Sequence, residues 1–173
     1  MPENQQDGRR FSVNGIHLVR TAQQIHVQLS AMADTKASIL MGATFVIFTI
    51  TIGQAHGSAA PLPLLILGAA AFVSAVCAVL AILPSTRPPE HGPLNLLFFG
   101  SFTRLSEEEY IEKLTAELMS DEGIYRTMAR DIYQNGTVLQ RKKYRLLGYA
   151  YRVFLVGLSA SFLTFIAQYI GRL

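Results

Sequence analysis

The chain has 173 residues, of which 50% are hydrophobic and only 16% are charged, and its formal net charge is +3. Soluble globular proteins have about 25% charged residues, so this composition argues against a soluble helical protein, and the length leaves no room for a second large domain. The small net charge gives little support to a generic nucleic-acid-binding function.

The N-terminal part, residues 1–36, is predicted to form a cytoplasmic helix that begins near residues 12–16. From there, apolar or small residues recur at alternating spacings of four and three, which is the pattern of a coiled-coil seam. This seam comprises Leu18, Ala22, Ile25, Leu29, Met32, Lys36 and Ile39. Because no helix-breaking residue lies between Gln28 and Phe48, the helix is expected to continue directly into the membrane.

Residues 37–83 are predicted to form a transmembrane hairpin. No Asp, Glu, Lys or Arg occurs in residues 37–86, and a charged side chain near the centre of a bilayer costs several kcal/mol. Residues typical of an exposed turn, including two prolines, interrupt this run at 54–63. The two spans are therefore expected at about 37–55 and 62–83.

Residues 84–145 are predicted to form a cytoplasmic loop followed by helices. The stretch from Asn95 to Phe102 (NLLFFGSF) is unusually apolar for a loop. Because exposure of these side chains to water would be unfavourable, the stretch is expected either to pack on the helices as a structural plug or to serve as a lid with a base-stacking role. Ser106 and Glu109 form a capping-box signature at the start of the next helix.

After a turn at 120–123, a long helix is expected to run into the third span, with a weak point and a kink at Asn135-Gly136. Residues 146–173 are predicted to form this third transmembrane helix and a short tail, because 153–171 again has no charged residue. Each of the three spans can cross the ~30 Å hydrocarbon core, which takes roughly 20 helical residues.

The sequence thus predicts an all-α membrane protein with three transmembrane helices, whose cytoplasmic helical extensions pack as a coiled-coil-like bundle. Small residues at packing spacing within the spans let helices approach closely, either within one chain or between chains. These residues are Gly68, Ala71, Ala75, Ala78, Gly157 and Ser161.

The distribution of Lys and Arg predicts the orientation in the membrane. Basic residues lie before the first span and between the second and third spans, and they include the cluster from Arg141 to Arg145. The predicted turn between the first two spans has none. By the positive-inside rule, the N-terminus is expected in the cytoplasm and the C-terminus in the periplasm.

No pattern in the chain predicts catalysis or a bound metal or cofactor. His17 and His26 are nine residues apart, about 13 Å along a helix, which makes them poor partners for one metal ion. The glutamates at 107–109 are explained by the positive end of a helix dipole. Cys77 is the only cysteine, so it is expected to be a small packing residue. We therefore predict that the protein is not an enzyme.

Charged residues at the cytoplasmic mouth of the spans leave alternatives open. Asp34 and Lys36 are expected to form a collar at the membrane boundary, with Lys36 reaching the headgroups, or else to face a partner helix or a pore vestibule. The basic cluster 141–145 is expected to bind lipid headgroups, or alternatively a ligand phosphate.

Three separated segments carry a resemblance to a known family. They are ADTKASIL at 33–40, NLLFFGSF at 95–102 together with SEEEY at 106–110, and VLQRKKYRLL at 138–147. With these segments the chain resembles the Pycsar transmembrane effector family, PycTM, from about Val19 onwards. The resemblance implies antiphage defence, in which a cyclase makes cyclic CMP or cyclic UMP on infection and the effector impairs the inner membrane. No segment resembles a conventional cyclic-nucleotide-binding β-roll, because 85–145 is predicted to be helical.

Three spans enclose little space, so a membrane-disrupting effector of this kind is expected to be a homo-oligomer in the bacterial inner membrane. A cyclic pyrimidine nucleotide (cUMP or cCMP) offers one phosphate charge and one base, so its site needs a fixed cation and a stacking or hydrogen-bonding surface. The candidate cations are Arg104, Arg141 and Lys143, and the candidates for the base are Asn95, Phe99 and Tyr144. The alternative function is a membrane-anchored adaptor that recruits a partner through its cytoplasmic helices.

Overall fold

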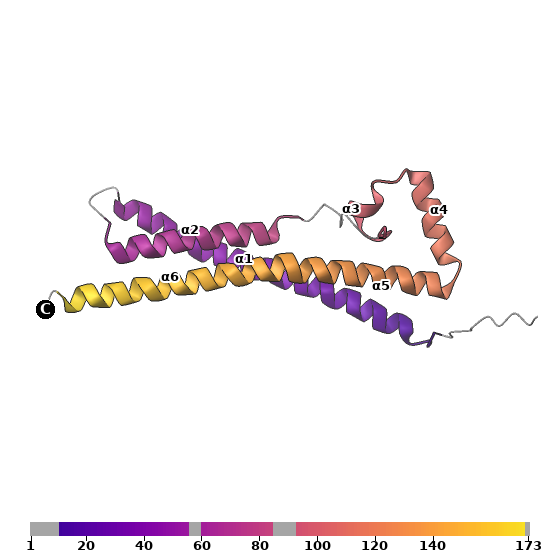
Figure 1. Cartoon of the computed structure of the whole chain (residues 1–173), viewed down its shortest axis with the longest axis horizontal. Coiled ribbons are helices and arrows are strands. Elements are labelled where there is room, and N and C mark those ends of the chain that lie inside the picture. Colours follow the sequence, from indigo (N-terminus) through magenta and orange to yellow (C-terminus); the bar gives the residue numbers. More distant parts are fainter. Residues whose placement is uncertain (1–10, 56–59, 85–92, 172–173) are drawn as a thin grey trace, which may run out of the picture. The chain divides into compact units, whose positions relative to one another are not determined.

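The computed structural model describes residues 11–55, 60–84 and 93–171 (Figure 1). The helices are α1 (Gly15–Ala55), α2 (Leu62–Ile82), α3 (Phe99–Phe102), α4 (Glu107–Leu118), α5 (Asp121–Val138), the π-helix η1 (Leu139–Tyr144) and α6 (Arg145–Ile170). No strand occurs in these described ranges. The predicted all-α class is therefore confirmed.

The chain divides into two compact units. The first comprises Met1–Val27 with Ser85–Gly136, and the second comprises Gln28–Pro84 with Thr137–Leu173. Two helical stretches, α1 and the run α5–η1–α6, contribute residues to both units. The predicted turn residues 56–59 lie outside the described residues.

Three helical stretches are long and apolar enough to cross a membrane, namely Gly15–Ala55, Leu62–Ile82 and Asp121–Ile170. Only 11–28% of their most apolar windows is buried within the chain. The second unit therefore presents most of its large apolar side chains outwards, as a bilayer requires. Examples are Phe45, Val46, Phe72, Leu155, Phe162 and Leu163.

Small residues make the helix contacts inside the second unit. A Cβ atom added to Gly68 would lie 2.7 Å from Cγ2 of Thr51, and one added to Gly157 would overlap Cβ of Ala70. These close approaches join α1 to α2 and α2 to α6 within one chain, so here the small residues of the spans pack within a chain. Ala71, Ala78 and Ser161 are likewise buried, and Ala75 is half-buried.

Hydroxyl groups in the spans are satisfied by backbone carbonyl groups. The Ser74 hydroxyl donates to the Ala150 carbonyl oxygen at 2.8 Å, and the Ser161 hydroxyl donates to that of Pro63 at 2.7 Å. Within α1, Thr44 and Thr51 donate to the carbonyl oxygens four residues earlier, both at 2.9 Å. Because these donors all have acceptors, the polar side chains are compatible with an apolar surrounding.

The face of α1 that packs within the second unit differs from the predicted seam. Ala33, Ala37 and Leu40 are buried there. Of the predicted seam, Leu18, Ile25, Met32 and Ile39 are instead 73%, 48%, 44% and 65% exposed. Lys36 is exposed as well, and Ala22 and Leu29 are half-buried. The packed face therefore lies one residue out of phase with the seam, because close packing selects small residues here.

The local signals predicted at the ends of α4 and α5 are largely confirmed. Ser106 Oγ accepts from the Glu109 N–H, and the Glu109 carboxylate accepts from the Ser106 N–H, so the capping box is present. The expected turn at 120–123 is shorter, because α5 begins at Asp121 and the Ser120 hydroxyl accepts from the Gly123 N–H at 3.0 Å.

The helix that leads to the third span deviates from α geometry later than predicted. It remains α-helical through Asn135 and Gly136 and widens into the π-helix η1 at Leu139–Tyr144. The i→i+5 winding of a π-helix advances each residue through a smaller angle. Three successive side chains, those of Lys142, Lys143 and Tyr144, can therefore each reach a partner in the second unit.

Candidate functional site

A buried carboxylate organises the first unit. Asp131, on α5, is 8% exposed. Its Oδ1 accepts hydrogen bonds from the side-chain amides of Asn95 at 3.1 Å and Asn135 at 2.8 Å, and its Oδ2 accepts one from the amide of Gln23 at 3.1 Å. In the described part of the chain no Lys or Arg pairs with it, so neutral amides alone compensate its burial.

The segment that begins at Pro93 is fastened to one face of α5. The side chain of Gln134 donates to the Pro93 carbonyl oxygen and that of Arg130 donates to the Leu94 carbonyl oxygen, both at 3.1 Å. Asn95 adds the bond to Asp131. Three consecutive residues of this segment are thus held by three residues of α5.

Asn95 is only 1% exposed, and its polar groups are engaged within the unit. Besides donating to Asp131, its side chain accepts from the Leu97 N–H at 2.9 Å, and its own N–H donates to Ser101 Oγ at 3.2 Å. A nucleotide base that forms a hydrogen bond with the Asn95 side chain would have to replace one of these existing hydrogen bonds.

Phe99 and Arg104, the other predicted site residues of this unit, are accessible. Phe99 is 56% exposed and its ring centroid lies 5.1 Å from that of Phe98. Arg104 is exposed, and no described residue pairs with its guanidinium. The apolar segment is thus divided: Leu96 is buried and Phe102 packs on Tyr110, while Phe99 faces outwards.

Two buried polar atoms beside this network have no hydrogen-bond partner among the described residues. They are Nδ1 of His26 and Oγ1 of Thr127. Thr127 lies one helical turn before Asp131, and a Cβ at Gly136 would lie 3.0 Å from Cε1 of His26. The first unit therefore contains polar binding capacity that its described residues leave unused.

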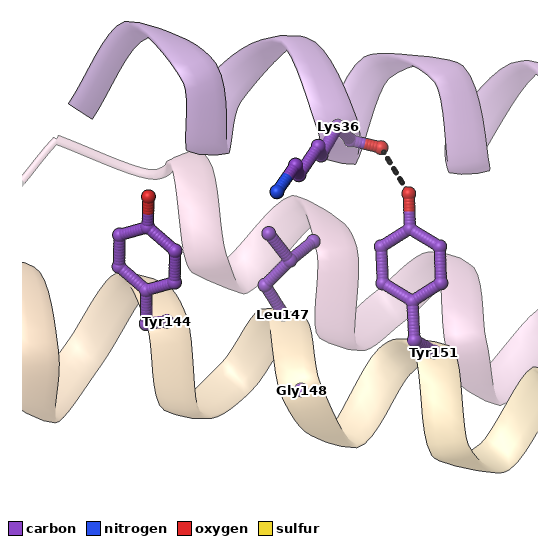
Figure 2. Close-up of a pocket in the computed structure, with 5 residues that line it drawn as sticks. All are labelled: Lys36, Tyr144, Leu147, Gly148 and Tyr151. Atoms are coloured by element: carbon purple, nitrogen blue, oxygen red, sulfur yellow. Dashed lines mark hydrogen bonds between the residues drawn. The ribbon is translucent and has the colours of Figure 1, made fainter. Parts of the chain in front are cut away.

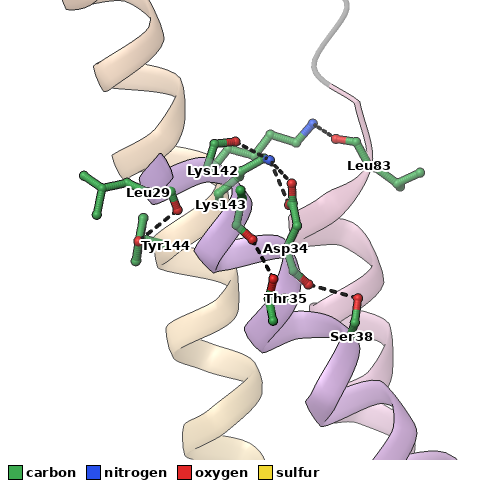
Figure 3. Close-up of polar contacts among 10 residues, drawn as sticks. Leu29, Asp34, Thr35, Ser38, Leu83, Lys142, Lys143 and Tyr144 are labelled. Atoms are coloured by element: carbon green, nitrogen blue, oxygen red, sulfur yellow. Dashed lines mark hydrogen bonds and ion pairs between the residues drawn. The ribbon is translucent and has the colours of Figure 1, made fainter. Parts of the chain in front are cut away.

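The second unit is called the membrane unit below, and the region where its uncharged runs begin is called its mouth. At this mouth, η1 is tied to α1 and to the end of α2 (Figure 3). The Lys143 ammonium donates to both oxygens of Asp34 and to Ser30 Oγ, each at 2.8 Å. The Lys142 ammonium donates to the Leu83 carbonyl oxygen at 3.0 Å. The Asp34 carboxylate is thus paired with a neighbouring helical segment of its own chain.

The tyrosines and Arg141 complete this region. The Tyr144 hydroxyl donates to the Leu29 carbonyl oxygen and the Tyr151 hydroxyl to that of Lys36, both at 3.1 Å. Arg141 is exposed and pairs with no described residue. A pocket of about 420 Å³ is lined by Lys36, Tyr144, Leu147, Gly148 and Tyr151 (Figure 2).

The six predicted nucleotide-site residues therefore fall into two groups. Asn95, Phe99 and Arg104 belong to the first unit, and Arg141, Lys143 and Tyr144 belong to the second. Asp131 and its amide partner Gln23 were not predicted from the sequence. A usable signal was present, because Gln134 and Asn135 follow Asp131 by one helical turn, where side-chain amides reach a carboxylate.

Nearly the whole chain takes part in the helices and polar contacts described above. The match to a known protein family extends over the same part of the sequence. The sequence profile described as the Pycsar effector protein domain, PycTM, matches residues 17–170. Comparison with curated proteins and with solved structures gave no match. The matched region includes described residues of both units and all three long apolar stretches. The chain belongs to the Pycsar effector protein domain family.

Proposed function

We propose that this protein is a membrane effector of antiphage defence that a cyclic pyrimidine nucleotide, cUMP or cCMP, switches into a form that disrupts the inner membrane. The observation that carries the proposal is the family match over 17–170, which includes both the polar first unit and the membrane unit. We infer an effector without catalytic activity, with its N-terminus in the cytoplasm and its C-terminus in the periplasm.

The first unit is the proposed sensor. The exposed Arg104 supplies a cation that no described residue neutralises, and the exposed ring of Phe99 supplies a stacking surface five residues earlier. Such a pair suits a ligand that carries one phosphate and one base. The unused polar atoms of His26 and Thr127 add hydrogen-bonding capacity in the same unit.

The proposed route to the membrane follows the continuous helical run α5–η1–α6. A π-helical turn is a less favourable winding that recurs at functional positions. The ion pair between Lys143 and Asp34 holds this turn against α1. A change in the first unit that turns α5 would act on this pair and hence on the packing of the spans.

Replacing Arg104 with alanine is expected to weaken nucleotide binding by at least about tenfold, because a charge-assisted hydrogen bond to phosphate contributes roughly 1.5–3 kcal/mol. The measurement is calorimetric titration of detergent-purified protein with cUMP and cCMP, with cAMP as the comparison. Arg126→Ala is the matched control, since Arg126 is an exposed arginine that pairs only with Glu122 in the described structure. In cells with an active cyclase, Arg104→Ala should abolish membrane depolarisation.

Three results would count against this assignment. One is unchanged binding in Arg104→Ala together with a loss in Arg141→Ala, which would move the cation to the second unit. Another is wild-type protein that binds neither cUMP nor cCMP, which would contradict direct sensing. The third is membrane depolarisation in cells that lack a cyclase, because the damage would then not require the nucleotide signal.

Homo-oligomerisation is supported by the exposed seam of α1. Leu18, Ile25, Met32 and Ile39 recur every seven residues and form an apolar row that the described residues leave exposed. Burying one such side chain against another copy contributes ~1.5–3 kcal/mol. Size-exclusion chromatography with light scattering should therefore detect an oligomer that Ile25→Asp dissociates.

The matched control for this seam is Val27→Asp. Val27 is 71% exposed on the same helix but lies off the row, so the same charge there should leave the oligomer intact. A monomeric wild-type protein would contradict the proposal, and so would equal dissociation by both variants.

The adaptor function remains the second candidate because α4 has no buried residue. Ile111 and Leu118 on α4 and the adjoining Met119 are 53%, 57% and 82% exposed. An apolar surface of this kind suits a protein partner. Depolarisation that needs only this chain and the nucleotide would favour the effector, whereas depolarisation that depends on a further protein would favour the adaptor.

A further inference from the structure

The pocket at the mouth of the membrane unit combines a cation with an apolar floor. Figure 2 shows the Lys36 side chain reaching over Leu147, between the rings of Tyr144 and Tyr151. Leu147 and Gly148 form the floor between the two tyrosines. A Cβ added to Gly148 would meet no atom within 4 Å, so the floor is open at this position.

The walls of the pocket are held in place by α1. The Tyr144 hydroxyl donates to the Leu29 carbonyl oxygen and the Tyr151 hydroxyl to the Lys36 carbonyl oxygen. Seven residues separate the tyrosines, which is about 10 Å along a helix. Both hydroxyl protons are therefore engaged, and the rings form two fixed walls, so a ligand would find the pocket already formed.

Among the described residues, no carboxylate compensates the charge of Lys36. Its ammonium pairs with no described residue, whereas the nearby Lys143 pairs with Asp34. A cation on the wall of a preformed pocket is complementary to an anion. The ligand is therefore expected to carry negative charge together with an apolar part that covers Leu147.

The position of the pocket indicates where this ligand comes from. Lys36 is the last charged residue before the uncharged run 37–86, and Tyr151 stands next to Arg152, the last charged residue before the uncharged run 153–171. Lysine and tyrosine at this depth lie at the level of the lipid headgroups. A ligand at this depth can place a phosphate on Lys36 and a hydrocarbon segment on the floor.

We propose that this pocket binds an anionic phospholipid, with the headgroup phosphate paired to Lys36 and the first acyl carbons lying over Leu147 and Gly148. A soluble phosphate would use the cation but not the apolar floor, which favours the lipid. The inference goes beyond the proposed signalling function and does not depend on it.

The test is lipid retention by the full-length protein, measured by native mass spectrometry after exchange into detergent with equal amounts of phosphatidylglycerol and phosphatidylcholine. Wild type should retain phosphatidylglycerol preferentially. Lys36→Gln should lower that retention about fivefold, the effect of one basic residue at an anionic surface, while Lys36→Arg should preserve it. Gly148→Leu should give a similar loss, because its Cβ atom stands in open space and the new side chain would occupy the floor.

Gly42→Leu is the matched control, since a Cβ at Gly42 on α1 also meets no atom within 4 Å. This variant should retain phosphatidylglycerol as wild type does. Equal retention of both lipids by wild type would overturn the proposal. The proposal would also be overturned if Lys36→Gln lost phosphatidylglycerol but Gly148→Leu did not. That pattern would mean that the lipid is held by surface charge and not in a pocket. Displacement of the lipid by millimolar inorganic phosphate would assign the site to a soluble anion.

Discussion

Replacing Asp131 with alanine should lower the local free energy of unfolding of the first unit by about 3 kcal/mol or more. Three amide groups, on Gln23, Asn95 and Asn135, would lose their acceptor. A buried donor left without a partner costs about 1–3 kcal/mol. The effect should appear as faster amide hydrogen exchange in α5 and in the segment that starts at Pro93, because Asp131 joins these two elements.

Asp131→Asn separates the loss of hydrogen bonds from the loss of volume. An asparagine whose carbonyl oxygen takes the place of Oδ1 can still accept from Asn95 and Asn135 and loses only the bond from Gln23. We therefore expect roughly 1–2 kcal/mol for this variant. Glu112→Ala removes an exposed carboxylate of the same unit and should change stability by less than about 0.5 kcal/mol. An Asp131→Ala protein with wild-type exchange rates would contradict the assigned role of the network.

Gly157→Leu should destabilise the membrane unit by about 3 kcal/mol or more. Any side chain at this position overlaps Cβ of Ala70 on α2, and Ala70 has no flexible atoms that could move aside. Helices α2 and α6 would have to separate, which also strains the hydrogen bonds from Ser74 and Ser161 that join them. Overpacking alone costs typically about 1–3 kcal/mol, and each buried bond adds about 0.5–1.5 kcal/mol.

The measurement for this variant is unfolding by SDS in mixed micelles, followed by far-UV circular dichroism. Gly157→Ala should lie between wild type and leucine, because it adds only the clashing Cβ atom. Gly42→Leu adds the same side chain where a Cβ meets nothing, so it should stay within about 1 kcal/mol of wild type. Equal stability of Gly157→Leu and Gly42→Leu would disprove the close approach of α2 and α6.

Features that depend on local sequence were predicted well from the residues alone. The second helix was expected at about 62–83 and is found at Leu62–Ile82. The capping box of Ser106 and Glu109 formed as expected. A charge-free run favours a membrane span because of the cost of placing charges in the bilayer, and a capping box joins residues only three positions apart. Neither effect depends on which other helix lies nearby.

The phase of the packed face on α1 was decided by the tertiary structure. A row of large apolar residues predicts the buried side of a helix in water. In a bilayer, lipid covers large side chains as well as a neighbouring helix does, so close packing selects small residues such as Ala33 and Ala37. Leu18 and Ile25 precede the uncharged run 37–86 and are exposed, so this part of the predicted seam is available to another copy of the chain.

The polar contacts that define the candidate sites also needed the tertiary structure. Gln23 and Asp131 are 108 residues apart, and Asp34 and Lys143 are 109 apart. Gln, Asp and Lys are all common on the solvated face of a helix, so none of these residues by itself indicates a buried contact. Burial removes the water that would otherwise satisfy such groups, so the pairing becomes specific only once helices distant in sequence lie side by side. The residues alone predicted three helical stretches that are long and apolar enough to cross a membrane. The packing of the helices decided which polar groups meet.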